Sequence, residues 1–339
     1  MDQFSTAVLT GTINQLRPVT RHLLDLYFPI VQTETSEEIH FDLVKGDRRM
    51  APFVAPVVAG QIMNDRGFET KTFKPAYVKP KFAWNPNRPF KRLPGEPLTG
   101  NLSPAQRQQK MLVQDLQTQQ DMVRRRLEWM AAQALCTGSI TVSGDQYATT
   151  VVNFGRTSSL TKVLTTTARW GEAGVDVLQN LKDWAQEVLV ASGAYPRNVT
   201  MDSKAWTLFQ KNDEVKERLK VLATASVQPI SYNGVDVEDA VFMGSLDGFN
   251  FYVYAGTYEA DNGVVTPFLP DYTVIMGGAG LQGAQAFGAI QDEESGLQAM
   301  PFFTKSWVEK DPGQRMLLTQ SAPLVVTQNV DGACCVTVR

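Results

Sequence analysis

The chain has 339 residues, 43% of them hydrophobic, and a formal net charge of −3 at pH 7. This length and hydrophobic content predict a folded chain with two substructures and exclude a globally disordered one. The small net charge excludes a protein that binds nucleic acid through its overall charge alone.

Three cysteines, Cys136, Cys334 and Cys335, are too few for a disulfide framework, and adjacent cysteines rarely bridge. We therefore expect reduced thiols in a cytosolic setting, with Cys136 as a small buried thiol. Asp2 stands where a signal peptide carries positive charge. The most apolar short stretch, residues 51–60, is broken by two prolines and is too short to cross a membrane. We expect no membrane association.

The first 50 residues predict a short apolar helix from Leu16 to Tyr27 and one alternating strand over residues 39–44. Residues 51–102 are predicted to be extended, because nine of the eighteen prolines lie between positions 52 and 104. Proline excludes a helix there and forbids a central strand, but permits edge strands and loops.

Residues 103–137 predict one long helix, a spine of about 50 Å at 1.5 Å per residue. Ser103, Pro104 and Gln106 form a start signal with a capping box, and the helix is expected to stop at Thr137 and Gly138. Its apolar stripe predicts a single buried face. We expect its other faces, which are rich in Gln and Arg, to contact either solvent or neighbouring subunits. The apolar stripe comprises Leu112, Leu116, Val123, Leu127, Met130 and Ala134.

The rest of the chain predicts a mixture of strands and helices. We expect a hairpin within residues 139–170, an amphipathic helix over 175–192, a strand at 199–201 and two helices capped by Asp202 and by Asn212 or Asp213. From residue 229 onward the pattern is mainly of strands, with turns at 233–234, 247–248 and 261–263. Strands are also expected at 323–326 and 335–338.

Charge is strongly segregated along the sequence. One stretch of the extended segment carries eight basic residues and a single acid, whereas no Lys or Arg lies between Lys220 and Lys305, where ten acids occur. The basic residues are Arg66, Lys71, Lys74, Lys79, Lys81, Arg88, Lys91 and Arg92. The main acidic candidates are Asp236, Glu238, Asp239, Asp247, Asp292, Glu293 and Glu294.

The basic stretch is interleaved with six aromatic residues, which suggests single-stranded nucleic-acid binding. The alternative is an arm that docks on an acidic surface of a sister chain, with aromatic side chains as anchors. We favour the second interpretation because the acidic counterpart exists in the same sequence. The basic residues are thus predicted to lie between subunits, and deletion of residues 55–98 is expected to leave a folded but unassembled subunit.

The sequence predicts no catalytic, metal-binding or cofactor-binding residues. His22 and His40 stand outside any metal-ligand spacing, and no serine elbow or Cys–His pair is present. Residues 278–283 match G-x-G-x-x-G after a predicted strand, but the acids that follow come too soon for a dinucleotide site. We interpret them as a glycine-rich loop, so that changing Gly280 or Gly283 to Ala should affect folding or assembly.

Several segments, taken in order, resemble the major capsid proteins of lambda-type tailed phages, the phage major capsid protein E family. They are residues 77–81, 92–94, 202–209, 215–219, 268–271, 288–292 and 320–324. Residues 1–45 and 139–175 show no such likeness.

The resemblance implies an α+β chain of the Hong Kong 97-type fold, in which an arm and an extended loop reach over neighbouring subunits. The implied map is an N-terminal arm at 1–50, an extended loop at 51–102, a peripheral domain at 103–170 that contains the spine helix 103–137, an axial domain at 171–300, and a return to the peripheral domain at 301–339.

The resemblance also implies a structural function without enzymatic activity: self-assembly of hexamers and pentamers into the icosahedral head of a tailed phage. The implied partners are a separate scaffolding protein, a portal, a decoration protein and packaged double-stranded DNA bound without sequence specificity. The implied location is the virion, with assembly in the host cytoplasm. An encapsulin-like compartment shell is the alternative, and a dinucleotide-binding enzyme rests on the glycine run alone.

Overall fold

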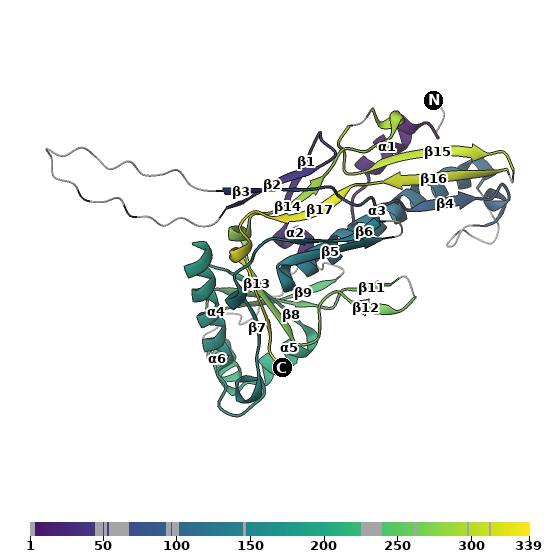
Figure 1. Cartoon of the computed structure of the whole chain (residues 1–339). Coiled ribbons are helices and arrows are strands. Elements are labelled where there is room, and N and C mark those ends of the chain that lie inside the picture. The colour runs from purple at the N-terminus through teal and green to yellow at the C-terminus, as the bar shows by residue number, and fades with distance from the viewer. Residues whose placement is uncertain are drawn as a thin grey trace.

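The computed structural model describes residues 4–44, 50, 53, 68–92, 96, 102–144, 147–224, 239–260, 263–296, 298–311 and 313–339. An elongated upper part contains helices α1 (Thr6–Gln15) and α3 (Pro104–Thr137) and several small sheets. It lies above a lower part with helices α4 (Val177–Ser192), α5 (Ser203–Lys211) and α6 (Asp213–Thr224) (Figure 1). The predicted turn at 233–234 and most of the turn at 261–263 lie outside the described residues.

A six-stranded sheet joins the two parts, in the strand order β7–β18–β13–β8–β10–β9. These strands are β7 (Thr161–Val163), β18 (Cys334–Thr337), β13 (Thr273–Gly277), β8 (Asn198–Asp202), β10 (Phe249–Tyr254) and β9 (Ala240–Leu246). Two neighbouring pairs, β8 with β10 and β7 with β18, are parallel, and the others are antiparallel. The predicted turn at Asp247 and Gly248 is confirmed between β9 and β10, since both residues have the positive φ values that a tight hairpin requires.

Helices α4 (Val177–Ser192), α5 (Ser203–Lys211) and α6 (Asp213–Thr224) cover one face of this sheet (Figure 1). The predicted helix signals are confirmed. The Asp202 side chain accepts a hydrogen bond from the backbone N–H of Lys204 at 3.0 Å, and Asn212 accepts one from that of Glu214 at 3.1 Å. Gly193 ends α4 in the left-handed conformation, with φ of 84°.

The spine helix α3 (Pro104–Thr137) lies on the other side of the sheet, in contact with β18 and with β17 (Pro323–Thr327). Its predicted start is confirmed: the Ser103 backbone N–H donates to the Gln106 side chain at 2.9 Å, and Ser103 Oγ accepts from the Gln106 N–H at 3.3 Å. Gly138 ends the helix with φ of 70°, as predicted.

The remaining strands form small sheets around the spine. A three-stranded sheet contains β1 (Ile30–Thr33), β14 (Gly283–Phe287) and β17 (Pro323–Thr327), and another contains β15 (Phe303–Glu309), β16 (Gln314–Gln320) and β4 (Lys81–Trp84). Three two-stranded ribbons pair β2 (Ile39–Val44) with β3 (Phe68–Phe73), β5 (Ser139–Gly144) with β6 (Tyr147–Asn153), and β11 (Thr257–Glu259) with β12 (Val265–Pro267). The strands of the proline-rich segment lie in a ribbon and at a sheet edge, as predicted.

The N-terminal segment corrects two expectations. Its helices are α1 (Thr6–Gln15) and α2 (His22–Tyr27), so the predicted helix from Leu16 to Tyr27 begins six residues too early. Leu16 is already extended, with ψ of 136°, and Pro18 disfavours helical backbone in the residue before it.

The same segment is buried by its own chain. Leu9, Ile13, Leu23 and Phe28 are all fully buried in the core on the spine side. The resemblance implies an arm that reaches over neighbouring subunits, but these residues of the arm are covered by their own chain and need no sister chain. In contrast, Phe53 in the extended loop is fully exposed in the single subunit.

The predicted boundary at residue 300 does not separate the sheets. Strand β18, from the segment expected to return to the peripheral domain, lies between β7 and β13 in the six-stranded sheet. Strand β14, from the segment expected to be axial, pairs instead with β1 and β17 in the upper part. The sequence pattern predicted the strand that became β18, but it predicted no individual strand at the position of β14 and could not identify the partners of either.

The loop deletion proposed from the sequence also needs correction. Removing residues 55–98 would delete β3 and β4, and with them Trp84, whose side chain is only 4% exposed in the core. Loss of such a side chain opens a large cavity. We therefore expect that deletion to prevent folding, and a deletion meant to test assembly must spare residues 68–98.

Candidate assembly surfaces

The spine helix buries a polar face as well as its apolar stripe, which corrects the expectation of a single buried face. Gln119 and Glu128 are fully buried, and Gln120 and Arg124 are nearly so. Gln119 donates to the backbone carbonyl of Leu317 at 3.1 Å and accepts from Thr319 Oγ1 at 2.7 Å. These polar groups are buried because they satisfy the backbone and side chains of other segments.

Three of these side chains bind the N-terminal segment. Gln120 donates to the carbonyl of Ile13 at 3.1 Å, and Arg124 Nε donates to that of Val19 at 2.8 Å. Glu128 accepts from the backbone N–H groups of residues 23 and 24 at 2.9 and 2.8 Å, at the start of α2. The spacing of Gln120, Arg124 and Glu128 at i, i+4 and i+8 was the sequence signal for this polar stripe.

Glu128 also accepts a hydrogen bond from Tyr254 Oη at 2.9 Å, which ties the spine to β10. Burial raises the pKa of Glu128 to about 7, although the hydrogen bonds from Leu23, Leu24 and Tyr254 act to lower it. This carboxyl group therefore changes its charge near neutral pH inside the core.

Ion pairs surround this contact. Arg21, 4% exposed, pairs with Asp239 at 2.7 Å and with Asp121 of the spine. Arg124 pairs with Asp25 at 2.7 Å. These charges hold the segment before and within α2 to the spine and to the residue preceding β9.

His22 is buried beside this cluster and forms part of the core on the spine side. Its Nε2 lies 3.0 Å from Thr200 Oγ1, which also lies 3.0 Å from Tyr27 Oη. Burial lowers the pKa of His22 to about 4. His40 bonds to Thr72 across the β2–β3 ribbon through a ring nitrogen at 2.9 Å.

Several predicted intersubunit residues already have partners in their own chain. Lys71 donates to the carbonyl of Asn153 at 2.9 Å, and Lys74 pairs with Glu37. Arg88 donates two hydrogen bonds, of 2.6 and 2.9 Å, to the carboxylate of Asp115 on the spine. Arg92 donates to the carbonyl of Glu96 at 2.6 Å.

The other basic candidates face outward. Lys79 is exposed, with Nζ 4.6 Å from the Tyr77 ring centroid, and Lys91 is also exposed. Lys81 Nζ lies 5.3 Å from the Trp307 ring centroid. Arg66 lies outside the described residues.

Most of the predicted acidic counterparts are not free in this subunit. Asp239 pairs with Arg21, Asp247 with Lys182 at 2.9 Å, and Asp292 with Lys305 at 2.5 Å. Glu294 accepts a hydrogen bond from Thr6 at 2.6 Å, and Glu293 is exposed. Asp236 and Glu238 lie outside the described residues. The sequence shows where the acidic residues are, but it does not show that many of them pair with Lys or Arg side chains of the same chain.

The glycine run has no helix on which a dinucleotide could rest. After β13 it forms a short 3-10 turn, Ala279–Leu281, and enters β14 of a different sheet. A Cβ at Gly283 would lie 2.2 Å from the Tyr27 carbonyl oxygen, and one at Gly280 would lie 2.1 Å from the Ala194 Cβ. These glycines allow close packing, which is a structural role.

The described part of the chain offers little for chemistry. It contains no cluster of three or more His, Cys, Asp or Glu side chains that could hold a metal ion. Within the same ranges, no helix is both long and apolar enough to cross a membrane. The three cysteines are free, and burial raises the pKa of Cys334 to about 12, so this thiol is unreactive.

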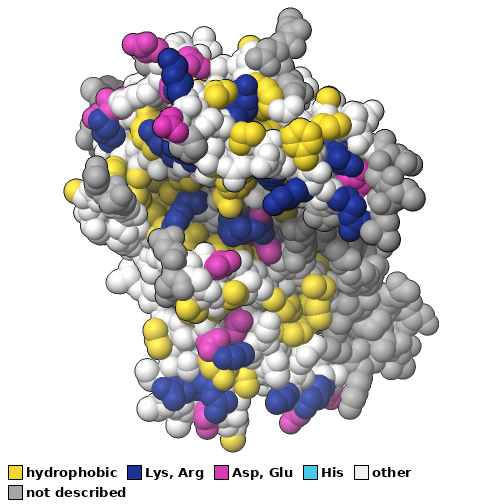
Figure 2. Space-filling view, turned by 90° about the vertical axis from the view of Figure 1, so that its right-hand side faces the viewer, with side chains coloured by type: hydrophobic (Ala, Val, Ile, Leu, Met, Phe, Trp, Pro, Cys, Tyr) yellow, Lys and Arg dark blue, Asp and Glu magenta, His cyan; other side chains and the backbone are white. Residues whose placement is uncertain are grey.

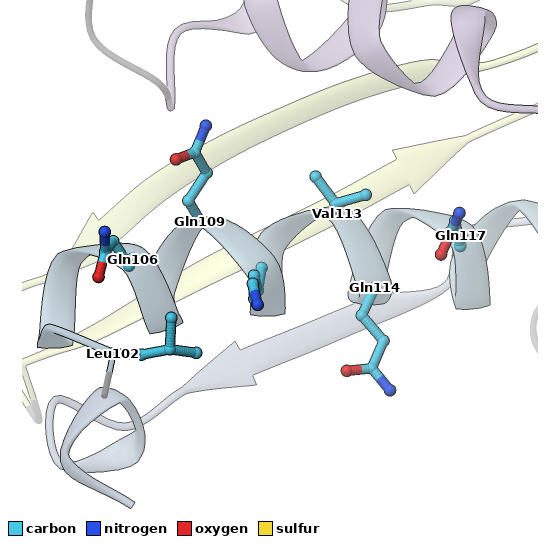
Figure 3. A pocket seen from close by; sticks show the side chains of 7 residues that line it. Leu102, Gln106, Gln109, Val113, Gln114 and Gln117 are labelled. Carbon is cyan, nitrogen blue, oxygen red and sulfur yellow. The ribbon is translucent and has the colours of Figure 1, made fainter. Parts of the chain in front are cut away.

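One face of the first half of the spine lines a shallow groove, mainly with glutamine side chains (Figure 3). The side chains of Gln109 and Gln114 point in opposite directions from the helix and do not converge on one point (Figure 3). Such an arrangement fits a contact surface and not a small-molecule site, which needs convergent polar groups.

A family model described as "Phage major capsid protein E" matches residues 5–338. The major capsid protein of Escherichia phage lambda is 29% identical over 336 residues, which cover 98% of each chain, and that of Escherichia phage N15 is 27% identical over the same share. A crystal structure described as a prophage capsid protein of E. coli CFT073 has a TM-score of 0.77 at 20% identity and covers 99% of each chain. The capsid of Ralstonia phage GP4 has a TM-score of 0.56 at 11% identity, over 95% of this chain and 91% of that one.

Proposed function

The chain belongs to the phage major capsid protein E family and has the α+β fold of phage capsid proteins, and on this premise we propose that it is the structural subunit of a capsid. The family match over residues 5–338 carries this conclusion. The family is one of structural proteins and not of enzymes. An encapsulin-like compartment is not favoured, since the relatives that match 98% of the chain are phage capsid and head proteins.

In more detail, we propose that the subunits form hexamers and pentamers of an icosahedral tailed-phage head, which encloses double-stranded DNA without reading its sequence. Assembly would occur in the host cytoplasm with a separate scaffolding protein and a portal, and a decoration protein would reinforce the shell. The exposed Phe53 supports a loop that neighbouring subunits cover, because a fully exposed aromatic side chain gains free energy from burial. The division into arm, loop, peripheral and axial domains stays part of this proposal, with the exceptions at β14 and β18.

The test is expression of the full chain, followed by sedimentation and electron microscopy. We expect closed shells built from rings of six and five subunits. A deletion of residues 54–67 removes none of the contacts described above. It should therefore give a folded subunit that does not form shells. Shells from this deletion would contradict the proposed role of the loop.

The basic residues that face outward, Lys79, Lys81 and Lys91, stay the best candidates for intersubunit contacts within the loop. Each exposed ion pair contributes only about 0–1 kcal/mol, but every subunit repeats it. Reversing the three charges to Glu should block assembly, and 1 M salt should weaken it, because the Debye length then falls to about 3 Å. If the reversal leaves shells intact and lowers only their 260 nm absorbance, the residues contact nucleic acid instead.

A further inference from the structure

A groove that the sequence did not reveal lies between the second half of α3 and the β11–β12 ribbon. Its lining includes Lys79, Met122, Arg125, Arg126, Trp129 and Tyr258. The right-hand side of the molecule is hollowed in this region, and Lys and Arg side chains gather in the hollow beside hydrophobic ones (Figure 2). The groove therefore combines positive charge with apolar surface.

Two of its cations have no carboxylate partner in the part of the chain that the structure describes. Arg126 lies over the Trp129 ring, 5.5 Å from its centroid, and Lys79 contacts the Tyr77 ring. Arg125, in contrast, pairs with Asp121. Met122 beside them is 40% exposed, which is high for a thioether side chain on a core helix.

The groove fits a protein better than a nucleic acid. The rings that could stack on bases are occupied, Trp129 by Arg126 and Tyr258 by Phe268 at a centroid distance of 5.0 Å. Glu259 also lines the groove and would repel phosphates. Strong nucleic-acid binding rests on many phosphate contacts or on stacked bases, and this groove offers few of either.

A surface of opposite character lies at β1. This strand is at the edge of its sheet, where an unpaired edge can receive another chain, and Ile30 and Val31 are 44% and 55% exposed. Residues 30–38 include three glutamates and no basic residue. Among the described residues, Glu34 and Glu38 form no ion pair, whereas Glu37 pairs with Lys74.

The two surfaces cannot meet within one subunit, since β1 lies above the spine and β11 below it (Figure 1). They match in charge and both expose apolar side chains. We infer that the groove between α3 and β11 receives the β1 edge of a second copy of this chain, with Glu34 and Glu38 facing Lys79 and Arg126. Such a head-to-tail contact joins different patches of neighbouring copies and can therefore build a ring. The inference rests on the proposed function, and it names the surfaces that join subunits.

The test reverses each surface in the full chain. One variant carries Lys79→Glu and Arg126→Glu, and the other carries Glu34→Lys and Glu38→Lys. Each alone should raise the protein concentration needed for assembly at least tenfold, with an unchanged circular dichroism spectrum and melting temperature. All four changes in one chain should restore shells, because the charges match again.

Mixing the two variants gives a sharper result. Alternating copies then have matched contacts all round a ring of six but not a ring of five, so the mixture should form rings in sedimentation without closing shells. Lys310→Glu, at the exposed turn after β15, is the matched control and should assemble like the parent chain. Normal assembly of either double variant, or failure of both the fourfold variant and the mixture to associate, would overturn the inference.

A zero-length carbodiimide crosslink separates this inference from the proposed function. We expect a crosslink between Lys79 and Glu34 or Glu38 of different copies, identified by mass spectrometry in mixed heavy and light protein. If the parent chain forms no shells but gives this crosslink, the proposed function fails and the contact stands. Shells without the crosslink and with no effect of the reversals reject the contact alone.

Discussion

The two faces of the six-stranded sheet are stabilised in different ways. On the face towards α4, α5 and α6, strand residues such as Val199, Phe251 and Met276 pack in an aromatic and aliphatic core. On the face towards the spine, Thr200 and Tyr254 bond to His22, Tyr27 and Glu128. Residues of the same strands therefore point alternately to two different cores. The core on the helical side is apolar, and the core on the spine side contains buried hydrogen bonds.

The two faces therefore contribute differently: one mainly to the free energy of unfolding, the other mainly to the position of the N-terminal segment. Apolar burial on the helical face is non-directional and tolerates changes of partner. Buried hydrogen bonds and ion pairs on the spine face are satisfied in one arrangement only, since each unpaired group would cost free energy. We infer that the spine face fixes where the N-terminal segment lies, while the helical face contributes mainly to the free energy of unfolding.

The largest expected effect comes from breaking the helical face. Trp170 is fully buried and stacks on Trp184 at a centroid distance of 6.0 Å. Trp170→Ala should lower the free energy of unfolding by about 3–5 kcal/mol, measured by urea denaturation of the unassembled subunit. Val190→Ala, at a 62% exposed position on α4, should change it by less than about 0.5 kcal/mol. Equal effects of the two variants would contradict this description of the core.

A substitution on the spine face should lower the free energy of unfolding by nearly as much, but its effect should be concentrated in the N-terminal segment. Glu128→Ala leaves the N–H groups of Leu23 and Leu24 and the Tyr254 hydroxyl without their acceptor, at a cost of about 3 kcal/mol. Hydrogen exchange should accelerate most in residues 19–28. Tyr254→Phe, which removes one donor and leaves the carboxyl group, should cost about 1 kcal/mol. Uniform acceleration across the chain would show that no local anchor exists.

The pH dependence of stability sharpens the comparison, because both titrating groups lie on the spine face. The pKa of Glu128 rises from 4.5 to about 7 on folding, so the folded state binds the extra proton and stability falls as pH rises from about 4.5 to 7. The pKa of His22 falls from 6.5 to about 4, so stability rises with pH from about 4 to 6.5. Each effect is about 3 kcal/mol at 1.36 kcal/mol per pKa unit, and the two oppose each other where the windows overlap.

Single variants should reveal what the parent chain hides. His22→Gln should leave the falling contribution of Glu128, so that the variant loses stability relative to the parent between pH 4.5 and 6.5. Glu128→Gln should show the opposite difference over the same range. Urea midpoints measured from pH 4 to 8 give both slopes, and slopes identical to the parent's would mean that neither group titrates as described.

The smallest expected effect is a gain in stability. Gly11 lies inside α1, and a Cβ there would meet nothing within 4 Å. Gly11→Ala should stabilise the subunit by up to about 1 kcal/mol, because Ala favours the helix. Gly138→Ala is the contrasting case: its φ of 70° and a Cβ only 2.8 Å from that of Arg156 predict destabilisation. Thermal melting of both variants checks the pair.

The helical face was largely predictable from the sequence, and the spine face was not. The stripe through Leu181, Trp184 and Val188 and the caps at Asp202 and Asn212 are local signals, and the structure confirms them. The partners of Glu128 lie about a hundred residues away on both sides, at Leu23 and Tyr254. No local pattern encodes such pairing, so the polar stripe was assigned to solvent or neighbours.

The assembly surfaces were predictable only in part, for the same reason. Lys79 was recognised from its charged stretch. Arg126 was predicted only as part of the polar remainder of the spine, left for solvent or neighbours, because the groove that it lines forms only where the β11–β12 ribbon lies beside the spine. Asp239 and Asp292 were recognised as acidic and are neutralised by Arg21 and Lys305 of the same chain. The sequence identifies the charged residues, but only the fold shows which of them have no partner in their own chain and can contact a neighbouring subunit.

The position of β18 has a consequence for synthesis of the subunit. This strand lies between β7 and β13, so the sheet that joins the two parts cannot close until residue 337 has left the ribosome. Its parallel partner β7 is about 170 residues earlier, and such non-local pairing slows folding. A nascent chain would therefore hold an incomplete sheet for most of its translation. We therefore expect partly made subunits to expose unpaired strand edges until the last strand is inserted, which favours aggregation over folding in that interval.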